Sequence, residues 1–458
     1  MPRVLLGQTL SFDADPFAEG IKAARHESHG AVVLENGHIS WVGPAEARPV
    51  SPDDTVVDYG RNLICAGFID AHLHHPQTAM IASWGKRLID WLNDYTFPEE
   101  ARLADPDYAR EIAKTYFDLA LSHGTTTMCS FATVHRTSVD SFFEEAQARG
   151  LRAITGKTCM DFEVPDTLCD TAQSAYDDSK VLLEKWHGVD RLEYAITPRF
   201  SPTSSREQLH ALGALWKEHP ECLMQTHLSE QLEEITWVKS LFRDARDYLD
   251  TYEMHGLLGE RGVYGHAIHL EPRERDRLAG IGASVVHCPT SNTFIGSGLF
   301  DMAGLKDSGL SVGLATDTGG GSSFSMLRTM AAAYEVAQLR GRALHPAELI
   351  WLATCGSARA LHLQDKVGNL VPGMEADLVV LDLASTPAIA QRNAQAESFW
   401  EALFPTIMMG DDRAIADVWV NGRRYNQKIK TKTLRCACAP RGVGGSAPAP
   451  LGAPPGYF

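Results

Sequence analysis

The feature that most constrains the fold is a regular alternation of strand-like and helix-like segments through the middle of the 458-residue chain. Eight runs rich in β-branched and other apolar residues predict strands at 63–69, 125–131, 151–156, 192–197, 222–226, 262–266, 283–287 and 310–316. Stretches between them carry apolar residues at helical spacing, among them 107–122, 139–149, 205–218 and 328–339. Eight strand–helix units within about 300 residues predict an α/β fold, a parallel (β/α)8 TIM barrel with insertions.

Strand signals at the two ends of the chain predict a second, smaller unit. Asn36-Gly37 and Asn421-Gly422 each lie between two strand-like runs, which is the strongest short-range signal for a two-residue hairpin turn. The last segment is rich in Pro and Gly and carries basic residues without an acid, so we expect it to be flexible. We therefore expect a composite β-sheet domain, the barrel and a tail at residues 1–66 with 369–426, 67–368 and 427–458.

Composition limits the partners and the compartment. The formal net charge of −16 disfavours nucleic acid as a partner, because its binders need clustered Lys and Arg. Nine cysteines, an odd number without disulfide-scaffold spacing, indicate a reducing cytoplasm. The apolar run at the start is too short for a signal peptide, and no later run approaches the about 20 apolar residues of a membrane span, so we expect neither export nor membrane insertion. We expect a cytoplasmic protein that binds a small, nearly neutral molecule.

A His-x-His pair, His72 and His74, stands at the first predicted barrel strand. Side chains at positions i and i+2 of a strand point to one face, so the two imidazoles can hold one metal ion. His227, His266 and Asp317 each follow at or just beyond the end of a later predicted strand. Because the C-terminal ends of barrel strands share one face, we expect these five side chains to meet there.

This set of residues is suited to metal-assisted hydrolysis. His72, His74, His227 and Asp317 would supply three nitrogens and one oxygen, as a catalytic zinc site with an open position requires. The ion lowers the pKa of bound water toward ~7. Glu230 lies three residues after His227, so we predict that it is the general acid/base.

Single residues in this set have ordinary alternatives. An isolated histidine at a strand end is usually a hydrogen-bonded structural residue, which is our interpretation of His75, His269 and His287. Asp317 could be the N-cap of the following helix. The glycines Gly319–Gly321 could cradle a phosphate, but no Lys or Arg lies nearer than Arg328, and we therefore predict a close backbone turn.

Two motifs point away from other functions. Residues 150–158 resemble a phosphate-binding loop but have one residue too many between the glycines. We therefore expect this segment to form part of the barrel wall. The zinc deaminases of the cytidine type require Pro-Cys-x-x-Cys, which the sequence lacks. Any deamination here would therefore use a different scaffold.

Six segments together carry a family resemblance: Phe68–Gln77, Asp90–Pro98, Thr197–Phe200, Gln225–Glu230, His287–Asn292 and Thr316–Gly321. Their His-x-His and Thr-Asp pieces resemble the metal-dependent amidohydrolases as a whole. The Trp-Leu-Asn and Pro-Arg-Phe pieces resemble the guanine deaminases within that family. The similarity spans most of residues 1–426.

The resemblance implies a homodimeric enzyme of purine catabolism or salvage that deaminates guanine to xanthine and ammonia. It implies one zinc ion per chain, held by His72, His74, His227 and Asp317. It assigns catalysis to Glu230, His266 and Asp317, with His266 either beside the reactive water or a fifth ligand. It assigns substrate contacts to Gln77, Arg199 and Phe200, with Arg199 as donor to the carbonyl O6. Asp317 would take the proton of the attacking water, and Glu230 would protonate ring N3.

Rival functions remain open. The nearest is a related deaminase that acts on 8-oxoguanine, another purine, a pterin or a triazine. A cyclic-amide hydrolase would often bridge two metals with a modified lysine; Lys157 is a nominal candidate, but it lies on the third predicted strand, where that residue is not expected. A catalytically silent scaffold has little need for Glu230 beside a ligand set. Sites of this kind also admit iron or manganese.

Overall fold

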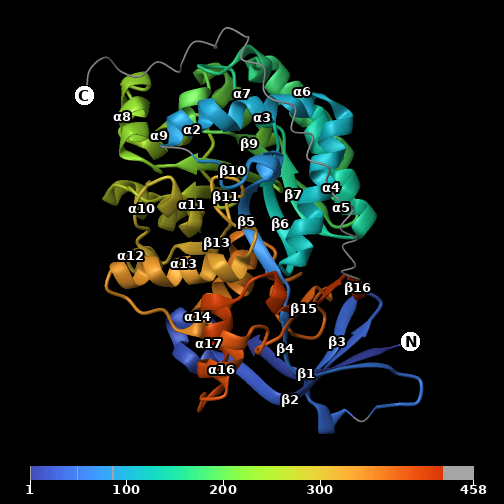
Figure 1. The fold of residues 1–458 in the computed structure, drawn as a ribbon. Helices are drawn as coiled ribbons and strands as arrows, with labels where there is room; N and C mark the ends of the chain where they lie inside the picture. The colour runs from blue at the N-terminus through green and yellow to red at the C-terminus, as the bar shows by residue number, and fades with distance from the viewer. Residues whose placement is uncertain (1, 49, 85–86, 426–458) are drawn as a thin grey trace.

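A computed structural model describes residues 2–48, 50–84 and 87–425 of the chain (Figure 1). Within these residues a barrel is formed by eight parallel strands: β5 Phe68–His74, β6 Thr125–Phe131, β7 Arg152–Gly156, β9 Leu192–Pro198, β10 Leu223–Leu228, β11 Gly262–His266, β12 Ser284–His287 and β13 Ser311–Leu314. The short β8, Thr158–Cys159, pairs with β9. The Asp317 N–H donates to the His72 carbonyl at 3.0 Å and so connects the last strand to the first. The predicted TIM barrel is confirmed.

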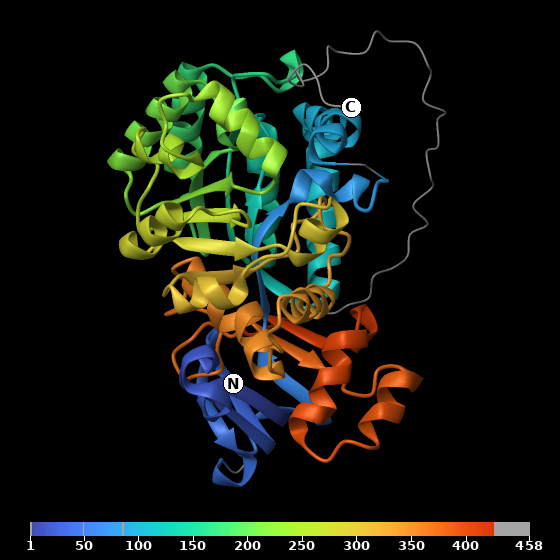
Figure 2. The same cartoon turned by 90° about the vertical axis from the view of Figure 1, so that its left-hand side faces the viewer.

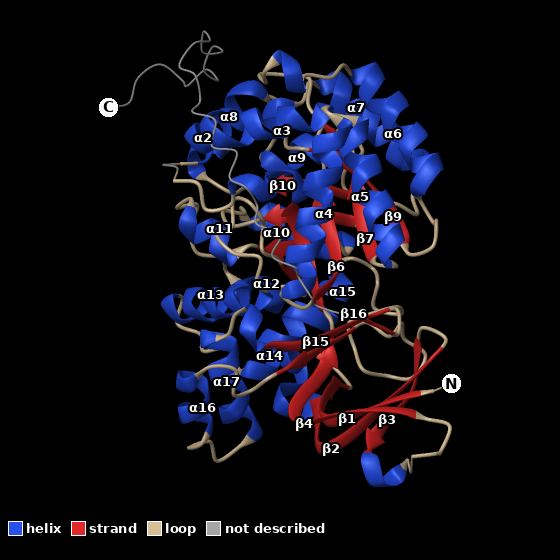
Figure 3. Ribbon diagram, turned by 45° about the vertical axis from the view of Figure 1, so that its right-hand side comes forward, coloured by secondary structure: helices blue, strands red, loops and turns tan. Residues whose placement is uncertain are grey.

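Helices surround the barrel strands on the outside (Figure 3). They are α4 Pro106–Ser122, α5 Arg136–Arg149, α6 Ala172–Trp186, α7 Arg206–Glu218, α8 Leu232–Leu241, α9 Tyr248–Glu253, α10 Pro272–Ile281, α11 Pro289–Phe294, α12 Met302–Asp307 and α13 Met326–Leu339. The predicted helices correspond to α4, α5, α7 and α13. Local signals set their ends: Ser205 caps α7 by accepting from the Gln208 N–H, and α5 ends at Gly150 with φ 68°. None of the described helices is long and apolar enough to cross a membrane.

The first predicted strand was wrong in its bounds. Residues 63–69 run across Gly67, where the chain leaves β4, Thr55–Ala66, and enters β5. A Cβ on Gly67 would lie 2.1 Å from the Thr126 Oγ1, so this close passage between strands requires glycine. As a result His72 lies inside a barrel strand rather than beyond its end. His227 likewise lies inside β10, which extends past the predicted strand 222–226.

A second sheet is built from both ends of the chain, which lie side by side below the barrel (Figure 2). Its order is β16-β15-β14-β4-β1-β2-β3, with β1 Arg3–Phe12, β2 Ala24–Glu35, β3 His38–Pro44, β14 Leu378–Leu381, β15 Ile415–Val420 and β16 Arg423–Tyr425. Asn36-Gly37 joins β2 to β3 with φ of 51° and 82°, and Asn421-Gly422 joins β15 to β16 with φ of 50° and 70°. Both predicted hairpins are confirmed, because a primed turn needs two positive φ angles.

Several helices of this region were not predicted. They are α1 Pro16–Glu19, α14 Pro346–Trp351, α15 Ser357–Ala360, α16 Pro387–Asn393 and α17 Phe399–Met409. The last two separate β14 from β15. The domain boundaries at residues 66 and 369 stay predictions, and the predicted flexible tail lies outside the described residues.

A buried charge network joins the barrel to the second sheet. Arg191, which precedes β9, is 8% exposed and donates from Nε to Glu375 at 3.0 Å and from Nη1 to Asp377 at 3.1 Å. Glu375 also accepts from the Arg152 Nε at 2.8 Å. Each charge is therefore paired and hydrogen-bonded, as burial requires.

We expect Arg191→Met to lower the free energy of unfolding by about 3–5 kcal/mol, because it leaves the buried Asp377 without its cation, while Glu375 keeps only Arg152. The change is measured by urea unfolding. Arg206→Met is the control, since Arg206 pairs with Asp244 at the exposed surface; its cost should stay below about 1 kcal/mol. Equal effects of the two substitutions would contradict a structural role for the buried network.

Candidate active site

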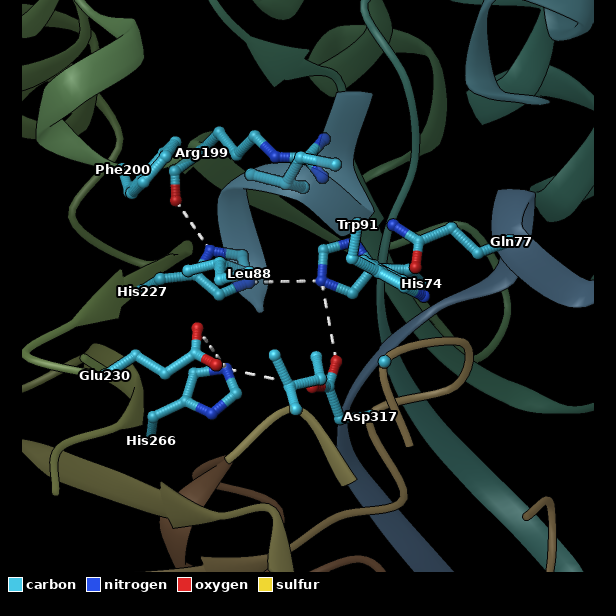
Figure 4. Close-up of a pocket in the computed structure, with 13 residues that line it drawn as sticks. His74, Gln77, Leu88, Trp91, Arg199, Phe200, His227, Glu230, His266 and Asp317 are labelled. Atoms are coloured by element: carbon cyan, nitrogen blue, oxygen red, sulfur yellow. Dashed lines mark hydrogen bonds and ion pairs between the residues drawn. The ribbon is translucent and has the colours of Figure 1, made fainter. Parts of the chain in front are cut away.

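A cavity of about 410 Å³ lies at the C-terminal ends of the barrel strands (Figure 4). Most of the residues predicted for the site line it: His74, Gln77, Arg199, Phe200, His227, Glu230, His266 and Asp317. His72 does not line it but lies against its wall, with its ring centroid 4.8 Å from that of His227 and 5.4 Å from that of His266.

Four predicted ligands converge beside this cavity. The Nε2 atoms of His74 and His227 lie 3.1 Å apart. The Asp317 Oδ1 lies 3.6 Å from the His74 Nε2 and 3.7 Å from the His72 Nε2. The His72 Nε2 is buried and has no hydrogen-bond partner among the described residues. Burial of a polar nitrogen without a partner costs free energy unless a ligand binds it. The donor set therefore fits a metal cation.

The protonation of the three imidazoles also suits a cation. Burial, followed by the neighbouring charge of His227, holds the pKa of His72 and His74 well below its ordinary value. Burial and His266 do the same to the pKa of His227. The His227 Nδ1 lies 2.7 Å from the Arg199 carbonyl, so this nitrogen carries the proton and Nε2 keeps its lone pair.

Glu230, His266 and Asp317 form a group of acids and bases next to the ligand cluster. The His266 Nδ1 contacts the Asn292 Oδ1 at 2.8 Å, which directs Nε2 toward the cavity. This Nε2 lies 3.6 Å from the Glu230 Oε2 and 3.8 Å from the Asp317 Oδ2. The Glu230 Oε1 accepts from the Ser297 Oγ at 2.7 Å. One imidazole therefore stands between two carboxylates.

Burial and neighbouring charges raise the pKa values of Asp317 and His266. Burial raises the pKa of Asp317 to about 6, although the His266 charge opposes the shift. Burial lowers the pKa of His266, but the charges of Glu230 and Asp317 outweigh it, and the pKa lies above its ordinary value. Groups that titrate near the working pH are suited to general acid/base catalysis.

Backbone strain is concentrated at the same place. Ser229, His266 and Asp317 follow or end β10, β11 and β13 with φ of 49°, 67° and 49°. A non-glycine residue in this region costs about 1–3 kcal/mol and persists where the surrounding structure holds it. Two of these residues, His266 and Asp317, line the cavity.

The sequence analysis missed several residues of the site. Leu88, Trp91, Leu92 and Ile295 supply an apolar part of the lining. Asn292 and Ser297 orient His266 and Glu230. The segments 90–98 and 287–292 contain some of these residues and carried the family resemblance, but nothing local assigned them a role.

The ordinary interpretation of the other histidines agrees with their contacts. The His75 Nδ1 lies 2.9 Å from the Ser130 Oγ, and its ring packs on Phe142 with centroids 4.6 Å apart. The His269 Nε2 contacts the Ser297 carbonyl at 2.8 Å, and His287 stacks on Phe300. Each of these rings therefore has a structural partner outside the ligand cluster.

The structure decides four alternatives that the sequence analysis raised. Asp317 is not a helix N-cap, because α13 begins only at Met326 and Ser325 caps it. A Cβ on Gly321 would lie 1.8 Å from the Thr316 carbonyl oxygen, so the glycines form the predicted close backbone turn. Lys157 is buried against Asp170 and does not line the cavity, which leaves it no role as a bridging metal ligand. Residues 152–156 are strand β7 and thus barrel wall.

Comparison with known proteins identifies the family. The model of the Amidohydrolase family matches residues 63–425. The chain belongs to the amidohydrolase family. This amidohydrolase is 44% identical over 403 residues to the guanine deaminase of Escherichia coli K12, covering 88% of this chain and 92% of that protein.

Solved structures resemble this amidohydrolase over nearly its whole length. E. coli guanine deaminase matches with a TM-score of 0.91 and 42% identity, covering 93% of this chain and 100% of that one. Guanine deaminase from C. acetobutylicum, solved with guanine in its active site, matches with a TM-score of 0.84 and 27% identity over 93% of this chain and 100% of that one. Amidohydrolases are typically metal-dependent, which agrees with the ligand cluster.

Proposed function

We propose that this amidohydrolase is a zinc-dependent guanine deaminase that converts guanine and water to xanthine and ammonia. The observation that carries the proposal is the convergence of His72, His74, His227 and Asp317 beside Glu230, at a cavity that Arg199 also lines. The similarity to guanine deaminases along most of the chain supports the choice of substrate.

The metal ion in this proposal is one zinc per chain. His72, His74, His227 and Asp317 would hold it, because zinc takes imidazole nitrogen and carboxylate oxygen and leaves a position for water in catalytic sites. When bound, the ion supplies a Lewis acid that makes hydroxide available at neutral pH. Elemental analysis of the purified protein tests both its identity and its stoichiometry.

The chain's own residues would move the protons. Asp317 accepts a proton from the attacking water as the new C2–O bond forms. Glu230 gives its proton to ring N3, where negative charge develops. His266, between the two carboxylates, orients the water. The proton held by Asp317 then passes to the 2-amino group, and the C2–N bond breaks to release ammonia. The C2 hydroxyl gives its proton back to Glu230 as the carbonyl of xanthine forms.

The remaining cavity residues would bind the purine. Arg199 donates to O6, Gln77 contacts the ring edge, and Phe200 packs beside them. Leu88 and Trp91 provide an apolar surface for the flat ring, and they exclude water from the reacting atoms.

A substrate panel tests the function directly. We expect the purified protein to release ammonia from guanine and little from adenine or cytosine, because Arg199 can donate to a 6-oxo group but offers no acceptor to an amino group in its place. The panel also includes 8-oxoguanine, which keeps the 6-oxo group and therefore tests the nearest rival substrate. Ammonia release is measured by a coupled assay. A preference for 8-oxoguanine, a pterin or a triazine would replace guanine as the substrate while keeping the reaction type.

A homodimer and a cytoplasmic location complete the proposal and stay predictions from the sequence. Light scattering coupled to gel filtration measures the oligomeric state. Fractionation of the source cells measures the location.

A further inference from the structure

Glu100 is a buried carboxylate that contacts both polar residues proposed to read the substrate. It is 0% exposed and does not itself line the cavity. Its Oε2 accepts from the Arg199 Nη1 at 2.7 Å, and its Oε1 accepts from the Gln77 Nε2 at 2.8 Å. A buried carboxylate with two such donors is a strong anchor, because charge-assisted hydrogen bonds are about twice as strong as neutral ones.

The helix that carries Glu100 also forms part of the cavity. It runs through α2 Leu88–Trp91, the π-helical turn η4 Leu92–Thr96 and α3 Phe97–Ala101. Pro98 lies within this run and has no N–H to donate to the preceding turn, which explains why the helix widens before it. The first turns bring Leu88 and Trp91 to the cavity, and α3 places Glu100 behind it.

Glu100 determines which way the Gln77 amide points. An amide oxygen and nitrogen have nearly the same shape, so the partners decide the orientation. A carboxylate only accepts, which requires the Gln77 Nε2 to face Glu100. On the other side the Gly319 N–H donates to the Gln77 Oε1 at 3.3 Å, which requires the oxygen there. Glu100 and Gly319 therefore require the same orientation of the Gln77 amide.

We propose that Glu100 is a positioning residue that makes the cavity select purines with an oxygen at position 6 and an N–H at position 1. This inference rests on the proposed function. Arg199, held by Glu100, can only donate and so matches O6. The Gln77 oxygen keeps a second lone pair for N1–H. A purine without O6 and N1–H leaves these buried groups unpaired, which lowers its affinity.

The test is Glu100→Gln, which keeps the size of the side chain but replaces one acceptor with an N–H donor. That donor faces Arg199 or Gln77, both of which also donate, so one contact is lost. We expect kcat/KM for guanine to fall about 10- to 100-fold, with a similar rise in the inhibition constant of hypoxanthine, which has O6 and N1–H. The inhibition constant of 2-aminopurine, which lacks both groups, should not change, and the metal content should stay that of the wild type.

Equal weakening of hypoxanthine and 2-aminopurine, or no weakening of either, would overturn the role of Glu100. Glu99→Gln is the matched control, because Glu99 lies in the same helix and instead contacts Arg102 at 2.8 Å. Glu100→Asp keeps the charge on a shorter side chain; it should show an intermediate, equally selective loss, and it carries the test where the Gln variant does not fold. If the wild type releases no ammonia from guanine, the proposed function fails, whereas an active wild type with an unselective Glu100→Gln variant removes only this inference.

Discussion

Glu230→Gln is expected to lower kcat for guanine by about 100- to 10,000-fold, because an amide cannot deliver a proton to ring N3 as charge develops there. The substitution keeps the size of the side chain, and its carbonyl oxygen can still accept from Ser297. The metal content should therefore stay unchanged, and KM should change little, since the lost interaction belongs to the transition state. Steady-state ammonia release and elemental analysis measure the two quantities.

Glu233→Gln is the matched control for this experiment. Glu233 lies three residues further along, is exposed, and pairs with Arg87 at the surface. It should keep wild-type kcat. Near-normal turnover by the Glu230 variant would remove the proposed acid from the mechanism, and loss of metal from it would mean that Glu230 helps to hold the ion.

His74→Ala is expected to lower metal affinity by more than about 100-fold. Loss of a residue that only supports a ligand lowers the affinity by up to about 100-fold, and loss of a ligand should cost more. The variant loses one of the four proposed ligands, and deamination should fall below detection. The fold should survive, because the His74 Nδ1 has no hydrogen-bond partner among the described residues and its loss leaves no donor unpaired. Metal content by elemental analysis and thermal unfolding report the two effects separately.

The control is His210→Ala, since His210 lies on the exposed side of α7. Its metal content and turnover should match the wild type. Chelation of the wild-type protein should also abolish turnover, and zinc should restore it. A His74 variant with full metal content would show that the ion, if present, is held elsewhere.

Much of the fold could be predicted because the signals for it are local. The strand at 125–131 and the helix at 107–122 follow from the spacing of apolar residues, and β6 and α4 agree with them within one residue. The hairpin at Asn36-Gly37 follows from the backbone that these two residues allow. The prediction of one strand at 63–69 was wrong because the segment divides at Gly67, and each half joins a different sheet. The strands with which the two halves pair lie far away in the chain.

By itself the sequence determined the kinds of chemistry available: a His-x-His pair, a His-x-x-Glu pair and an Asp, each close to the C-terminal end of a predicted strand. Only the tertiary structure decided how these groups are oriented and which other residues support them. Glu99 and Glu100 are identical neighbours in the chain, yet the first bonds to Arg102 and the second to Arg199 and Gln77. Successive side chains on a helix point in different directions, so packing against β9 and η3, His75–Met80, selected which of the two carboxylates became part of the site.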